Sequence, residues 1–138
     1  MIFRELTKFS KKIAFVDQDR REVKYSEIIK YNVALSKFVK KKSSIIILSE
    51  NSIESLVGYV SLSMLNTVLI PINPQISKES LKKLLIKYLP NFLWINKDML
   101  NLTGIKNYKI LLEKKNYIFI EFNKNKNYKI NNDLFILL

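Results

Sequence analysis

The sequence has 138 residues and a formal net charge of +12, and 48% of its residues are apolar. This composition is ordinary for a folded domain and excludes a collagen-like or largely disordered chain. The chain has no cysteine, no histidine and only 2 glycines, which excludes disulfides, thiolate zinc sites, Ser–His–Asp triads and glycine-rich phosphate loops.

The positive charge comes mostly from lysine. Arginine, with its bidentate guanidinium group, is the side chain that phosphate and base recognition favour. The lysine excess is therefore interpreted as a solvated surface, and nucleic acid is an unfavoured partner. No stretch has the pattern of a membrane span or of a signal peptide, so a cytoplasmic location is expected.

The first elements in chain order are a hairpin and a helix. Residues 13–16 and 23–25 flank a polar stretch, a pattern typical of two short strands joined by a turn. Ser26 is expected to be the N-cap of the helix that follows, with Glu27 at the positive end of the helix dipole. Lysines 40–42 suit the opposite end, so the helix is expected to end near them.

A buried strand and a buried helix come next. Residues 44–48 are apolar at nearly every position, which is typical of a strand covered on both faces. Residues 53–65 are predicted to form a mostly buried helix that ends at Asn66, because asparagine tolerates the left-handed conformation. A second buried strand is predicted at 68–70 and is expected to end at Pro71.

A third helix and a third strand complete this part of the chain. Ser77 is expected to cap a helix over residues 78–88. Its apolar stripe consists of Leu81, Leu84, Leu85 and Tyr88. Residues 92–95 are predicted to form a strand. The alternation of helices and strands over 26–95 predicts a parallel α/β sheet with right-handed crossovers.

The last third of the chain is rich in predicted strands. Two strands are expected at residues 108–112 and 117–122, followed by an exposed loop at 123–129. Residues 133–138 end the sequence on an apolar run, whereas termini are commonly polar and frayed. This last run is interpreted as a strand that is cut off before its continuation.

Four passages follow one another in a recognisable order. Residues 24–28 lie at a helix start, and residues 45–54 contain a strand, an Asn-Ser pair and the beginning of a helix. Residues 62–74 contain a leucine-rich helix end and a strand that ends in Pro-Ile-Asn-Pro, and residues 81–95 contain the next helix and strand. Together they resemble the N-terminal portion of the adenylate-forming, or AMP-binding, enzymes. That family includes acyl-CoA and aryl-CoA synthetases, the amino-acid-activating domains of peptide synthetases, and beetle luciferases.

The resemblance also implies where the family's catalytic groups lie. Residues 133–138 resemble the strand that leads into the family's phosphate loop. That loop, the magnesium ligand, the ribose-binding Asp and the catalytic Lys of the family all come later, so no catalytic, cofactor-binding or metal-binding residue is assigned here. ATP and Mg²⁺, with coenzyme A or a carrier-protein pantetheine, are implied for the parent enzyme and not for this chain.

The predicted organisation is a single incomplete α/β domain over residues 1–138. It divides into an N-terminal segment with the hairpin (1–25), an α/β unit (26–95) and a strand-rich segment that ends before the phosphate loop (96–138).

The favoured function is therefore the N-terminal scaffold of an ATP-dependent, AMP-forming carboxylate ligase, inactive alone. Its expected partner is the remainder of the parent chain or a complementing subunit, and an uncovered sheet edge predicts self-association. One alternative is a non-enzymatic α/β module whose basic surface binds nucleic acid or an anionic partner. Another is a complete subunit that forms a site together with a second chain.

Several polar groups have a structural interpretation that is favoured over a catalytic one. Ser26 and Glu27 suit a helix start better than a catalytic pair. Glu50 and Glu54, one helical turn apart, are interpreted as solvated rather than as an acid/base or metal pair. The polar residues 49–52 follow a buried strand, where α/β sheets place ligand crevices, but turn formation is the favoured interpretation.

Aromatic and basic groups are interpreted in the same way. Phe92, Trp94 and Tyr88 are expected to pack in the core rather than to stack on nucleic-acid bases. The lysines at 40–42 and those at 82, 83 and 87 are expected to be separate solvated groups rather than one basic patch.

Overall fold

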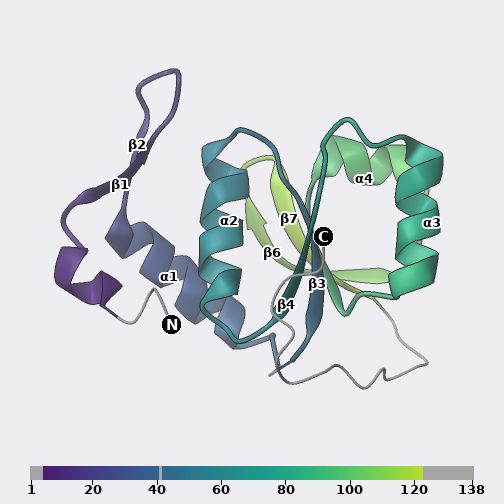
Figure 1. Ribbon diagram of the computed structural model, residues 1–138, viewed down its shortest axis with the longest axis horizontal. Coiled ribbons are helices and arrows are strands. Elements are labelled where there is room, and N and C mark those ends of the chain that lie inside the picture. Colours follow the sequence, from purple (N-terminus) through teal and green to yellow (C-terminus); the bar gives the residue numbers. More distant parts are fainter. Residues whose placement is uncertain (1–4, 41, 123–138) are drawn as a thin grey trace.

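The computed structural model describes residues 5–40 and 42–122. In chain order the elements are η1 (Leu6–Phe9), β1 (Ile13–Val16), β2 (Glu22–Lys24), α1 (Tyr25–Ser36), β3 (Ser44–Leu48), α2 (Ile53–Ser63), β4 (Val68–Ile72), α3 (Lys78–Tyr88), β5 (Phe92–Asn96), α4 (Lys97–Thr103), β6 (Tyr108–Lys114) and β7 (Tyr117–Phe122). The first two strands form a hairpin, and the others form a five-stranded sheet in the order β4-β3-β5-β7-β6 (Figure 1).

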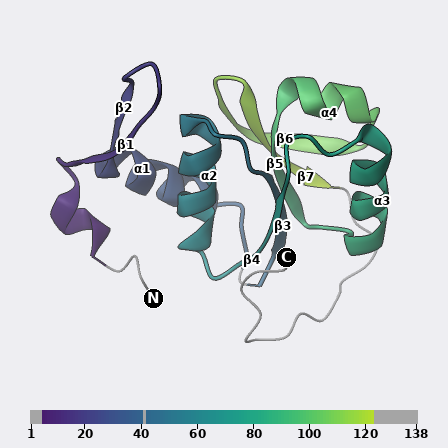
Figure 2. The same ribbon diagram turned by 45° about the horizontal axis from the view of Figure 1, so that its top comes forward.

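Strands β3, β4 and β5 run parallel, as the alternation of helices and strands predicted. The chain passes through α2 to reach β4 on one side of β3, and returns through α3 to reach β5 on the other side. Right-handed crossovers in opposite directions place α2 and α3 on opposite faces of the sheet, as Figures 1 and 2 show. The predicted α/β fold class is confirmed, and the strand-rich last third joins the sheet antiparallel through β7 and β6.

Consecutive residues of β3 face two different cores. Ile45 and Ile47 point to the side of α1 and α2. Ile46 and Leu48 point to the side of α3 and α4. All four side chains have no exposed surface, which explains why the strand is apolar at consecutive positions.

Aromatic side chains of β5 and β7 fill the core on the α1 and α2 side. Phe92 stacks on Phe119 with ring centroids 5.0 Å apart, and the ring of Trp94 lies 5.6 Å from that of Tyr117. Phe92 and Trp94 are buried, so the prediction of core packing is confirmed for both. Tyr88 is half-buried and packs against the opposite core.

Helix α2 approaches Trp94 closely because position 58 has no side chain. A Cβ at Gly58 would lie 2.1 Å from the indole nitrogen of Trp94. The same indole N–H donates a hydrogen bond of 3.2 Å to the main-chain oxygen of Glu54, one turn earlier in α2. Gly58 therefore sets the distance between this helix and the sheet.

The predicted boundaries of the first helix are wrong. Helix α1 begins at Tyr25, so the expected N-cap Ser26 lies inside it, and no side chain caps this end. The N–H groups of Tyr25 and Ser26 instead donate to the main-chain oxygens of Lys12 and Ser10. The helix also ends at Ser36, before the lysine run, because the chain turns there toward β3.

Two further boundaries differ from expectation. Strand β4 continues through Pro71 to Ile72, which is possible because β4 is an edge strand of the sheet within the described residues. Helix α4 was not predicted, because its 7 residues are too few for a periodic apolar stripe. Its ends nonetheless carry ordinary signals: the Asn96 side chain caps the first turn, and Gly104 ends the helix with a φ of 64°.

Other predictions of local structure are confirmed. Asn66 has the predicted left-handed conformation with a φ of 52°, although α2 ends at Ser63 rather than at residue 65. The Ser77 side chain caps α3 by accepting from the N–H of Ser80. The loop expected at 123–129 and the strand expected at 133–138 lie outside the described residues. Within the described part of the chain, no helix is long and apolar enough to cross a membrane.

Candidate functional site

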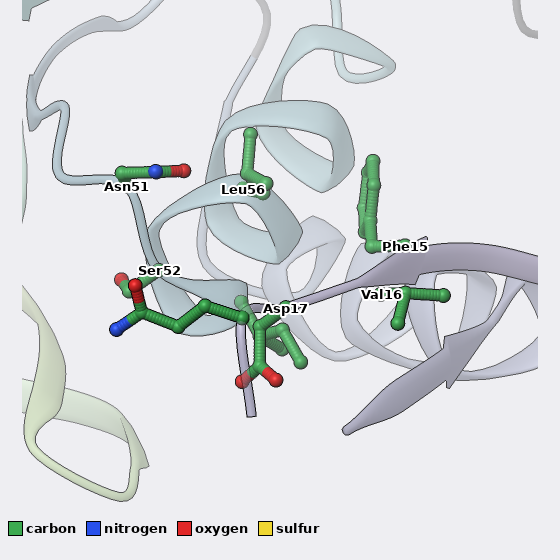
Figure 3. Close-up of a pocket in the computed structure, with 8 residues that line it drawn as sticks. Phe15, Val16, Asp17, Asn51, Ser52 and Leu56 are labelled. Carbon is green, nitrogen blue, oxygen red and sulfur yellow. The ribbon is translucent and has the colours of Figure 1, made fainter. Parts of the chain in front are cut away.

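A small hollow lies between the β1–β2 hairpin and the start of α2 (Figure 3). Its volume is about 130 Å³. One wall comes from the hairpin and the other from the segment that joins β3 to α2. The lining residues are Phe15, Val16, Asp17, Gln18, Asn51, Ser52, Ile53 and Leu56. This is where an α/β sheet would place a ligand crevice, because the second wall follows the carboxyl end of β3.

The turn between β3 and α2 is held by its own side chains. The hydroxyl of Ser52 accepts from the N–H of Ser55 at 3.2 Å and caps α2. The hydroxyl of Ser55 donates to the main-chain oxygen of Leu48 at 2.9 Å and accepts from the N–H of Glu50 at 3.1 Å. Both hydroxyls therefore stabilise the turn, as turn formation predicted, while Asn51 remains exposed at the hollow.

Glu54, in the first turn of α2, is a buried carboxylate with two cationic partners. Its side chain is 5% exposed, and Oε1 lies 3.3 Å from Nη1 of Arg21 and 3.2 Å from Nζ of Lys115. Burial acts to raise the pKa of Glu54, but its main-chain N–H, Lys115 and Arg21 outweigh burial and hold the pKa below its ordinary value. The interpretation of Glu54 as a solvated group is therefore wrong.

Arg21 connects this carboxylate to the wall of the hollow. Its Nε donates to Asp17 at 2.5 Å while Nη1 contacts Glu54. Burial acts to raise the pKa of Asp17, and the hydrogen bonds and charge of Arg21 reverse that effect and lower it. This ion pair was not expected from the sequence, although Asp17 and Arg21 are four residues apart in a predicted turn.

Glu50 has different surroundings from Glu54. It is half-buried next to the phenol of Tyr117, whose hydroxyl donates to the main-chain oxygen of Leu48 at 3.3 Å. Burial, and then the neighbouring Glu50 carboxylate, raise the pKa of Tyr117 well above its ordinary value. The two glutamates, which are four positions apart in the sequence, therefore have different partners: Glu54 pairs with Arg21 and Lys115, and Glu50 lies beside Tyr117.

The tip between β6 and β7 contacts both helices of this side. Lys114 pairs with Glu27 of α1 and lies 4.4 Å from the ring centroid of Tyr31, whereas Lys115 pairs with Glu54 of α2. Glu27 lies in the first turn of α1, as predicted, whereas Ser26 is exposed and makes no cap.

The hydroxyl and carboxylate groups at and beside the hollow already have partners within the fold. The hydroxyls of Ser52 and Ser55 are engaged with main-chain atoms, and the carboxylates of Asp17 and Glu54 are engaged with cations. Over residues 5–40 and 42–122, no group of three or more acidic side chains is arranged to hold a metal ion.

No family model matches the sequence, and no curated protein matches it. Solved structures do share its fold. MatB from Rhodopseudomonas palustris with ATP bound aligns with a TM-score of 0.59 and 16% identity over 75% of this chain and 22% of that chain. A luciferase-like enzyme from the mealworm Zophobas morio aligns with a TM-score of 0.58 and 21% identity over 70% of this chain and 24% of that chain.

The N-terminal subdomain of NpsA from Klebsiella oxytoca aligns with a TM-score of 0.54 and 22% identity over 67% of this chain and 26% of that chain. The chain has the fold of the N-terminal portion of these enzymes. The likeness to adenylate-forming enzymes is therefore confirmed at the level of the fold. The aligned region spans about a quarter of the length of each of the three chains.

Proposed function

We propose that this chain is the N-terminal scaffold of an ATP-dependent, AMP-forming carboxylate ligase. The observation that carries the proposal is the fold shared with ATP-bound MatB and with the NpsA N-terminal subdomain, which was also solved with 3-hydroxybenzoyl-AMSN. In the parent enzyme, ATP and Mg²⁺ would activate the carboxylate, and coenzyme A or a carrier-protein pantetheine would accept the acyl group.

The scaffold role follows from what adenylation requires. Attack of a carboxylate on the α-phosphate of ATP depends on positioning and on neutralisation of phosphate charge by N–H groups, lysine and magnesium. The chain has only 2 glycines, Gly58 and Gly104, and Gly58 is committed to the contact with Trp94. The polar groups at the hollow are engaged in the turn and in ion pairs, so they support the fold rather than the reaction.

The first test is an ATP–pyrophosphate exchange assay on the purified chain with a panel of aliphatic, aromatic and amino acids. We expect no carboxylate-dependent exchange. Exchange above the level measured without a carboxylate would overturn the assignment of a scaffold that is inactive alone. A denatured sample of the same preparation provides the background.

The second test is the coding sequence that follows the codon for Leu138. A stretch similar to Thr-Ser-Gly-Thr-Thr-Gly directly after it would support the proposal, because that sequence would supply the phosphate loop. A stop codon in that place would contradict the scaffold-fragment assignment. It would favour a subunit that is completed by a second chain.

One observation favours the alternative of a basic binding module. The outer face of α3 carries four exposed lysines with one exposed acid, Glu79, among them. These lysines are Lys78, Lys82, Lys83 and Lys87. Binding of a DNA duplex that weakens steeply as salt rises would support this module. Binding that is absent at low salt would exclude it.

A further inference from the structure

The two walls of the hollow belong to parts of the molecule that are attached differently. The wall from α2 is fixed in the body, because Gly58 lies against Trp94 and the main-chain oxygen of Glu54 accepts from the indole N–H of Trp94. The wall from the hairpin stands apart from the five-stranded sheet in both ribbon views (Figures 1 and 2). Val16, in that wall, is 58% exposed.

The tip of the hairpin is a self-contained unit. The Asp17 carboxylate accepts from the main-chain N–H groups of Asp19 at 3.0 Å and Arg21 at 2.8 Å, and the N–H of Asp17 donates to the oxygen of Arg21 at 3.0 Å. Among the described residues, the hydrogen bond that joins this tip to the body is the one from Arg21 to Glu54. The base of the hairpin is anchored to α2 by apolar packing, because Val23, Phe15 and Ala14 belong to the same cluster as Ile53 and Val57.

We propose that the tip of the β1–β2 hairpin, residues 17–21, is a movable part of the wall of the hollow and that Arg21 is the latch that holds this tip against α2. Arg21 contacts Asp17 in one wall and Glu54 beside the other, so this side chain bridges the tip to α2, while apolar packing holds the base of the hairpin. Release of Arg21 lets the tip swing outward about the base at Phe15 and Val23 and widens the hollow on the side of Asp17 and Gln18.

The second cation on Glu54 makes this opening feasible. Removal of the last partner from a buried carboxylate is costly, because the charge is left without compensation. Lys115, from the tip between β6 and β7, lies 3.2 Å from the same oxygen and stays in place when Arg21 leaves. Arg21 itself is 42% exposed and is hydrated when released. The ion pair between Arg21 and Glu54 can therefore break without leaving either charge uncompensated, because Lys115 still contacts Glu54 and water hydrates Arg21.

Hydrogen exchange of the folded chain tests the proposal. In Arg21→Gln, we expect the amides of the hairpin tip, residues 17–21, to exchange about tenfold faster, while those of β3 and β5 change by less than about twofold. Lys115→Gln is the matched control, because it removes the other cation from the same carboxylate without touching the hairpin. It should leave exchange in residues 17–21 unchanged.

Three outcomes would overturn the latch: unchanged hairpin exchange in Arg21→Gln, equal acceleration of β3 and β5, or hairpin acceleration of the same size in Lys115→Gln. A second measurement uses the absence of cysteine in the sequence. Spin labels on Asp19→Cys in the hairpin tip and Asn51→Cys in the opposite wall should show a longer and broader distance distribution when Arg21→Gln is added. An unchanged distribution would contradict the proposal.

Discussion

The sheet with its helices and the β1–β2 hairpin differ in what holds them in place. In the body, apolar side chains cover both faces of the central strands, and Ile45, Leu69 and Leu93 have no exposed surface. In the hairpin, Ile13 is 46% exposed and Val16 is 58% exposed. The tip reaches the body through a charged side chain, Arg21.

This difference predicts two kinds of response to mutation. Burial of apolar surface is non-directional and scales with area, so changes in the body should lower the stability of the whole domain. An ion pair at a half-exposed position depends on two specific groups and on the pH. Changes to the ion pairs of Glu54 with Arg21 and Lys115, called the joint below, should therefore have smaller and more local effects.

The largest effect is expected for Trp94→Ala. Trp94 is fully buried between α2 and β7, and its removal should lower the free energy of unfolding by about 4 kcal/mol through lost contacts and a residual cavity. Chemical denaturation followed by circular dichroism measures the change. Tryptophan fluorescence is not suitable, because the variant lacks the single tryptophan of the chain. Leu102→Ala is the control, since Leu102 is 61% exposed. Equal losses in the two variants would show that Trp94 is not central to the core.

The two glycines provide the next comparison. Gly58→Ala would place a Cβ 2.1 Å from the indole nitrogen of Trp94, and we expect a loss of about 3 kcal/mol from overpacking. Gly104→Ala meets no atom within 4 Å, but its φ of 64° is unfavourable for alanine, so a loss of about 1 kcal/mol is expected. Thermal unfolding of both variants shows which substitution lowers stability more. A larger loss in Gly104→Ala would contradict the close packing of α2 on the sheet.

The joint between the two regions should be sensitive to pH. Glu54→Gln removes the charge that pairs with Arg21 and Lys115, and it should lower stability at neutral pH by about 1–2 kcal/mol. Because the pKa of Glu54 is lowered in the folded state, its contribution is fully present at neutral pH and is lost as the pH falls below about 4.3.

Denaturation of the parent chain and Glu54→Gln from neutral to acid pH tests this prediction. The stability difference should shrink as the pH falls, because both proteins then carry an uncharged side chain at this position. A difference that stays constant down to the lowest pH would exclude an ionised Glu54 as its source. Lys115→Gln should give a smaller change, since Lys115 is 60% exposed.

The smallest effects concern the two helix starts. Ser52 caps α2 with its side chain, so Ser52→Ala should cost about 1 kcal/mol. Ser26 lies inside α1, whose first N–H groups donate to the backbone of residues 10 and 12, so Ser26→Ala should change stability by less than about 0.5 kcal/mol. Denaturant titration of both variants distinguishes them, and a larger loss at Ser26 would restore the N-cap that the sequence suggested.

The candidate site was only partly accessible to sequence analysis. The segment after β3 was recognised as polar and turn-forming, and Ser52 and Ser55 do form its turn. The hairpin wall was not recognised, because the pattern at residues 13–25 indicates a hairpin but not where it packs. The misinterpretation of Glu54 has the same origin: a glutamate in a first turn is ordinarily exposed, and nothing nearby in the sequence identifies its partners.

The order of helices and strands apart from α4 and the double-sided burial of residues 44–48 follow from the sequence alone, because they rest on local hydrophobic patterns and turn residues that act over a few positions. The resemblance to adenylate-forming enzymes rests on four passages of the sequence taken in order. The tertiary structure decided which residues meet at the joint. Arg21 and Glu54 are separated by 33 positions and Glu54 and Lys115 by more, and such contacts form only when packing of the sheet and helices brings these segments together.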